Sequence, residues 1–81
     1  MKKPKLRYQR FRDVIQSLNG YVVVDTGYTV DGFFETAVFR CNEKGEIKTD
    51  ADWIELDLER YPSDKEMYSG HQRMIGKWAK K

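Results

Sequence analysis

Two ionisable side chains, His71 and Glu35, are the strongest candidates for chemistry in this sequence. His71 is the single histidine of the chain, and histidine is the side chain that ordinarily titrates near neutral pH. Glu35 is the one charged residue on the predicted core face of a strand pair. A histidine beside a carboxylate could act as a general acid or base, or it could hold two elements together as a buried pair. We therefore predict a polar core pair of Glu35 and His71.

The residues around this pair complete no recognisable catalytic or metal site. The three serines show no nucleophile-elbow or triad spacing. One cysteine and one histidine are too few for a structural zinc site, and Asp50 and Asp52 lack the glycine and terminal glutamate of an EF-hand loop. We predict a non-enzymatic protein with no metal and no cofactor. A small-ligand binder or an enzyme around His71 and Glu35 is a weaker alternative.

The charges are segregated along the chain, although the net charge is only +2. Residues 1–12 hold six basic side chains and no acid. Basic side chains contact phosphates and aromatic rings stack on bases, so this segment is a candidate nucleic-acid site. Its candidate residues are Lys2, Lys3, Lys5, Arg7, Tyr8, Arg10 and Arg12.

An acidic stretch covers the middle of the chain, where residues 42–59 hold seven acids against two lysines. From residue 54 to residue 59 apolar and acidic residues alternate, which indicates a half-buried strand with a wet acidic face. That face carries Glu55, Asp57 and Glu59. Carboxylates two residues apart on a strand lie about 6.5–7 Å apart, close to the phosphate spacing of a nucleic-acid strand. The acidic face is therefore a candidate site for a basic protein partner.

A predicted hairpin over residues 21–41 is the element that must position these groups. Asp31-Gly32 lies between two β-rich runs and predicts a two-residue type I′ turn. This turn would place Val24 opposite Phe39 and Tyr28 opposite Glu35. The predicted core face holds Val22, Val24, Thr26, Tyr28, Val30, Phe33, Glu35, Ala37, Phe39 and Cys41.

Residues 8–18 fit two different structures. Their apolar residues fall at helical spacing, whereas Asn19-Gly20 is typical of a hairpin turn that would pair Ile15 with Val24. A strand is slightly favoured, because Val22 to Val24 would otherwise form an exposed apolar edge. Residues 1–7 are predicted to form a mobile basic arm.

Residues 63–79 are predicted to form an amphipathic helix. Ser63 and Glu66 have the spacing of a capping box, and Gly70 would allow a close approach to the sheet. The apolar stripe is Met67, His71, Met74, Ile75 and Trp78. The chain is thus predicted to be one α+β domain over residues 1–81. An antiparallel β-meander of three to four strands over residues 10–61 packs one face against this C-terminal helix.

Cysteine content and hydropathy indicate the compartment. Cys41 is the single cysteine, which is typical of a reducing environment, and we predict that it is a small buried strand residue. The basic start is followed by no apolar segment of a signal peptide, and no run reaches transmembrane length. A cytoplasmic location without membrane contact is therefore expected.

The order of motifs resembles that of a family of small, uncharacterised proteins encoded by phages and prophages of bacteria. The shared motifs are Glu35-Thr36-Ala37-Val38-Phe39, a turn at Gly45, Trp53…Leu56-Asp57…Arg60-Tyr61, and Gly70-His71…Met74…Lys77-Trp78. The likeness covers roughly residues 20–79 and departs at Ala37, where the family has methionine, and at Met67, where it has a small residue. The resemblance implies a phage or prophage gene and the host cytoplasm, and it implies no activity.

The predicted function is a non-enzymatic phage or prophage accessory protein that binds a host or phage macromolecule. A host or phage protein is the first partner expected, and the alternative is a nucleic acid bound by the basic N-terminal segment. The sequence leaves open whether the chain is a monomer or a homodimer, since a free edge strand could pair across a dimer axis.

Overall fold

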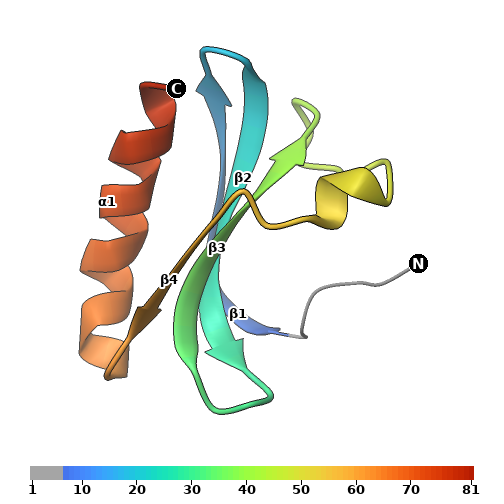
Figure 1. Ribbon diagram of the computed structural model, residues 1–81. Helices are drawn as coiled ribbons and strands as arrows, with labels where there is room; N and C mark the ends of the chain where they lie inside the picture. Colours follow the sequence, from blue (N-terminus) through green and yellow to red (C-terminus); the bar gives the residue numbers. More distant parts are fainter. Residues whose placement is uncertain (1–6) are drawn as a thin grey trace.

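The chain folds into a four-stranded antiparallel meander, in the order β1-β2-β3-β4, with one α-helix packed against the sheet (Figure 1). This structure is a computed structural model that describes residues 7–81. The elements are β1 (Arg7–Ser17), β2 (Gly20–Thr29), β3 (Phe34–Cys41), β4 (Asp57–Tyr61) and α1 (Met67–Ala79), with short 3-10 turns η1 (Ala51–Trp53) and η2 (Asp64–Glu66). The predicted α+β class is confirmed, and residues 8–17 are strand rather than helix.

The central strands are buried on both faces of the sheet, because each face has a cover. Figure 1 shows α1 on one side and the segment containing η1 on the other. On the helix face, Val22, Val24 and Val38 pack with Met74. On the opposite face, here called the far face, Val23, Ala37, Phe39 and Cys41 form a second cluster that Ile47 and Trp53 pack against. Val22, Val23 and Val24 are consequently all buried.

The β2–β3 pairing differs by one residue from the predicted register. Val24 pairs with Val38 and not with Phe39. The loop has three residues, since the Thr29 amide donates to the Phe33 carbonyl over 2.8 Å. Within residues 7–81 only glycines have positive φ, and Gly32 (+89°) is the one in this loop. A type I′ turn requires positive φ at both central residues, so that prediction is wrong.

This one-residue shift turns every side chain of β3 to the other face, because side chains alternate along a strand. Thr36 and Val38 now share the helix face with Thr26 and Val24. Glu35, Ala37, Phe39 and Cys41 belong to the far face.

The β1–β2 hairpin is shifted by two residues, which leaves the faces unchanged. Ile15 pairs with Val22 rather than with Val24, and Ser17 pairs with Gly20. The loop is therefore Leu18-Asn19, and the Ser17 hydroxyl donates to the Gly20 carbonyl over 2.8 Å. Ile15 still packs on the helix-face cluster.

Strand β4 begins later than expected, and its side chains point to the opposite faces from those predicted. Asp57 pairs with Val38 and Glu59 with Thr36, so both acids lie on the helix face. Leu58 pairs with Ala37 on the far face. Ile54, Leu56 and Leu58, which were expected to point inward, are 67%, 40% and 38% exposed.

The helix agrees with its sequence pattern. Met67, His71 and Met74 are buried, and Ile75 and Trp78 pack at the edge of the same core. Ser63 precedes the 3-10 turn as its N-cap residue, but its hydroxyl donates to the Glu66 carboxylate and accepts no hydrogen bond from a backbone amide of the turn. No helix within residues 7–81 is long and apolar enough to cross a membrane.

Candidate functional site

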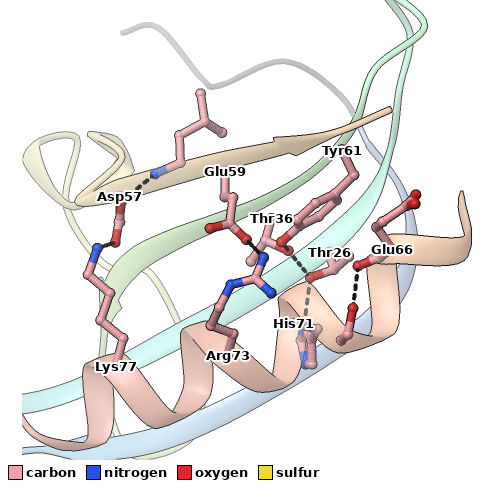
Figure 2. A network of polar contacts seen from close by, with 11 residues as sticks. Thr26, Thr36, Asp57, Glu59, Tyr61, Glu66, His71, Arg73 and Lys77 are labelled. Atoms are coloured by element: carbon pink, nitrogen blue, oxygen red, sulfur yellow. Dashed lines mark hydrogen bonds and ion pairs between the residues drawn. The ribbon is translucent and has the colours of Figure 1, made fainter. Parts of the chain in front are cut away.

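A line of hydrogen bonds runs through the helix-side core from β1 to β4. His71 Nε2 lies 2.7 Å from Asp13 Oδ2, and His71 Nδ1 lies 2.6 Å from Thr26 Oγ1. Thr26 Oγ1 lies 2.5 Å from Thr36 Oγ1, which accepts a 2.7 Å hydrogen bond from the Tyr61 hydroxyl. Figure 2 shows its members Tyr61, Thr36, Thr26 and His71. We call these four residues, together with Asp13, the polar chain.

The donors and acceptors of the polar chain can be assigned from both ends. The Asp13 carboxylate only accepts, so the N–H of a neutral His71 ring lies on Nε2 and Nδ1 accepts. Each hydroxyl has one hydrogen to donate. Because Thr36 accepts from Tyr61, it donates to Thr26, which in turn donates to His71. Every hydrogen bond therefore points the same way along the polar chain.

Burial decides what this arrangement can do. A carboxylate, a histidine and a hydroxyl in this order activate a nucleophile in hydrolases. Thr26 and Thr36 are fully buried, however, and His71 is 1% exposed. The Thr26 hydroxyl also donates its hydrogen to His71 and accepts from Thr36, both within the polar chain. The geometry therefore supports a structural role, and the absence of enzymatic activity stays a prediction.

Burial also raises the pKa of Tyr61 to about 12, although its hydrogen bond with Thr36 acts in the opposite direction. Tyr61 consequently keeps its phenolic hydrogen at neutral pH and remains a donor to Thr36. This end of the polar chain has a fixed direction for that reason.

Glu35 and His71 do not form the predicted pair. Both are buried as expected, but they lie on opposite faces of the sheet. Glu35 accepts a 3.0 Å hydrogen bond from Arg60 Nε on the far face. The physical reason is the one-residue shift of β3, which puts Thr36 where Glu35 was expected.

The acidic face of β4 is turned toward the helix and is not a wet surface. Asp57 accepts hydrogen bonds from Lys77 Nζ at 2.7 Å and Trp78 Nε1 at 3.0 Å. Glu59 is paired with Arg73. Figure 2 shows Arg73 and Lys77 reaching from α1 to these two carboxylates. Glu55, the third predicted residue, precedes β4 and is half-buried.

We expect Asp57 to contribute to stability in a pH-dependent way. Burial alone raises its pKa, but hydrogen bonds from Lys77 and Trp78 outweigh burial and lower it overall. A lowered native pKa gives a contribution that is present above the unfolded value and lost as pH falls through the native value. Asp57→Asn should cost about 1–2 kcal/mol at pH 7 and less at pH 3. Urea unfolding at both pH values measures this difference, with the exposed Asp50→Asn as control. Equal losses at pH 7 and pH 3 would contradict it.

The predicted nucleic-acid residues are only partly placed. Lys2, Lys3 and Lys5, with most of the predicted arm, lie outside the described residues, as does the side chain of Arg7, although its backbone begins β1. Tyr8, Arg10 and Arg12 are exposed on this outer strand. Arg12 Nη2 donates to the Gly45 carbonyl over 2.8 Å. Arg10 lies at a register irregularity between Gln9 and Phe11, and such bulges redirect a side chain.

Cys41 is buried on the far face, as predicted. Burial raises the pKa of its thiol, although Arg12 and Arg40 oppose this effect. A raised pKa leaves little thiolate at neutral pH, so the thiol is a poor nucleophile. Within residues 7–81 no three His, Cys, Asp or Glu side chains are grouped to hold a metal ion.

Sequence reasoning missed several residues that the structure brings together. Asp13, Thr26, Thr36 and Tyr61 come from four strands, and only the true registers place them beside His71. Tyr28 was expected opposite Glu35, but it lies between Tyr8 and Phe34. One sequence feature could have indicated Asp13. It lies two residues before Ile15 on a predicted strand, so the two side chains share a face.

Comparison with known proteins identifies no relative of this chain. No family model matches it, and neither the curated proteins nor the solved structures yield a match. The resemblance to phage and prophage proteins stays a prediction.

Proposed function

We propose that this chain is a small non-enzymatic protein that binds nucleic acid along β1 and the basic segment before it. The phage or prophage context implied by its sequence motifs is part of this proposal. The observation that carries it is an outer strand on which Tyr8, Arg10 and Arg12 are all exposed. Residues 1–12 hold six basic side chains and no acid, which matches the charge of a phosphate backbone.

The position of the acids supports nucleic acid over a basic protein. Asp57 and Glu59 lie on β4, which is the outer strand at the opposite side of the sheet from β1. Both carboxylates are already paired with basic side chains of α1. Asp57 and Glu59 therefore lie away from β1 and offer no free carboxylate row on this strand.

Salt-dependent binding tests the proposal. Fluorescence anisotropy with a labelled 20-nucleotide strand and its duplex should show an affinity that falls as NaCl rises. Removing one phosphate contact lowers the slope of log K against log[salt] by about 0.7 for a single strand or about 0.9 for a duplex. We expect Arg10→Ala to lower the slope by about one such contact. The triple change of Lys2, Lys3 and Lys5 to alanine should lower it by about three.

Lys48→Ala is the matched control, because Lys48 is an exposed cation outside the basic segment and faces Glu46 at 3.4 Å. It should bind like the wild-type chain. The proposal is wrong if neither strand nor duplex binds, or if Arg10→Ala and Lys48→Ala weaken binding equally.

A protein partner is the second candidate, and a different observation favours it. Ile54, Leu56 and Leu58 are exposed at or just before β4, an outer strand of the sheet. Grouped apolar side chains beside an outer strand are typical of protein contacts. Light scattering over a range of protein concentrations, with Leu58→Glu as the variant, tests whether a second copy binds there. A monomeric wild-type chain would leave only a different protein as the partner.

A further inference from the structure

Four aromatic side chains form a cross-strand row at one end of the sheet. Tyr8 of β1 pairs with Tyr28 of β2, which pairs with Phe34 of β3, which pairs with Tyr61 of β4. Paired residues point to the same face of a sheet, and Tyr61 places this row on the helix face. The rings of Tyr28 and Phe34 have centroids 5.0 Å apart and planes tilted by 49°.

The helix covers only one end of this row. Gly70 lies directly against the ring of Tyr61, which is 8% exposed. Phe34 is half-buried, while Tyr28 is 39% and Tyr8 61% exposed. Exposure therefore increases toward β1, the strand that carries the basic side chains.

We propose that Tyr8 and Tyr28 stack on the bases of a single-stranded nucleic acid whose phosphates are held by the basic part of β1. This inference rests on the proposed function and specifies its ligand. A ring on a sheet surface can stack only on a base whose flat face is free, which a single strand offers and a duplex does not. The partner is thus a single strand of either DNA or RNA.

Charge on the neighbouring elements agrees with this ligand. Arg10 follows Tyr8 by two residues on the same strand, a separation of about 6.5–7 Å along the backbone that is similar to the phosphate spacing of a nucleic-acid strand. The nearest acid along β1 is Asp13, whose carboxylate accepts a hydrogen bond from His71. Asp31 is in the loop after β2, where Tyr28 Oη lies near Gly32, and it interacts with other groups of the chain.

The test compares ring removal with charge removal in the full chain. The probes are a labelled 12-nucleotide oligo-dT, the matching oligo-U and a DNA hairpin duplex with the same number of phosphates. We expect Tyr8→Ala to weaken binding to both single strands about tenfold, with an unchanged salt slope and little effect on the duplex. Tyr28→Ala should act in the same way, whereas Tyr8→Phe and Tyr28→Phe should bind like the wild-type chain.

Leu18→Ala is the control, because Leu18 is 78% exposed in the β1–β2 loop, at the opposite end of β1 from the row. It should leave binding unchanged, and thermal unfolding shows whether each variant is folded. If both tyrosine-to-alanine variants bind single strands as well as Leu18→Ala while Arg10→Ala weakens binding, stacking is overturned and nucleic-acid binding stands. If no probe binds the wild-type chain, both proposals fall. Tighter binding to the duplex than to the single strands would also overturn stacking.

Discussion

Gly70→Ala is expected to destabilise the protein by about 2 kcal/mol or more, although alanine is the better helix former. A Cβ at position 70 would lie 2.3 Å from three atoms of the Tyr61 side chain, including its hydroxyl oxygen. Tyr61 cannot swing away freely, because its hydroxyl donates to buried Thr36. Overpacking of this kind costs about 1–3 kcal/mol and sometimes more, and the gain in helix propensity offsets only about 1 kcal/mol.

The same helix supplies the control. Gly76 is exposed, and a Cβ there meets nothing within 4 Å. Gly76→Ala should therefore stabilise the protein by up to about 1 kcal/mol. Urea unfolding of the two variants gives opposite signs if the contact with Tyr61 is the cause. In a Tyr61→Leu background the cost of Gly70→Ala should shrink, and an undiminished cost would show that another contact is responsible.

Thr26→Val is the second change with a large expected effect, a loss of about 2–5 kcal/mol. The substitution keeps the shape of the side chain but removes the hydroxyl at the centre of the polar chain. His71 Nδ1 loses its donor and the Thr36 hydroxyl loses its acceptor, and both groups are buried. Each unsatisfied buried group costs about 1–3 kcal/mol.

The double variant Thr26→Val, Thr36→Val separates hydrogen bonding from packing. Removing both hydroxyls no longer leaves Thr36 as a buried donor without an acceptor, so the double change should cost less than the sum of the two single changes. Thr49→Val makes the same substitution at an exposed loop position, where it removes one hydrogen bond from the Asp52 amide (3.3 Å), and it should cost no more than about 1 kcal/mol. Additive losses in denaturant unfolding would argue against a coupled chain.

Local chemistry was enough to predict the kinds of element, an antiparallel meander of three to four strands and a C-terminal helix. The apolar stripe from Met67 to Trp78 predicted both the helix and its buried side. Gly45 has φ of +82°, as its turn required, and Cys41 is buried as a strand residue should be. These features depend on residues close together in sequence, whose periodicity and conformational preferences act before any long-range contact forms.

The candidate site depended on strand register, which local chemistry did not determine. Asp31-Gly32 is compatible with a two-residue and a three-residue loop, and the choice between them turns β3 over. With two apolar covers available, either face of β3 can be buried, so the hydrophobic pattern does not select between the registers. Thr36 and not Glu35 therefore reaches His71 through Thr26.

The faces of β4 also depend on contacts between residues that are distant in sequence. Its alternation of leucines and acids marked a strand correctly, but amphipathic patterning assumes that acids face water. Instead, Arg73 and Lys77 on α1 form ion pairs with Glu59 and Asp57. The sequence around β4 does not predict these partners.

Residue chemistry and periodicity alone predicted that Glu35 and His71 would be buried and that an antiparallel meander would carry a C-terminal helix. Which of these side chains contact one another depends on how the strands pair. The tertiary structure separated Glu35 from His71, joined His71 to Asp13 and Thr26, and aligned Tyr8 with Tyr28. The reason is that burial follows from each residue's own chemistry and pattern, whereas partnership across strands follows from register, which a single extra loop residue changes.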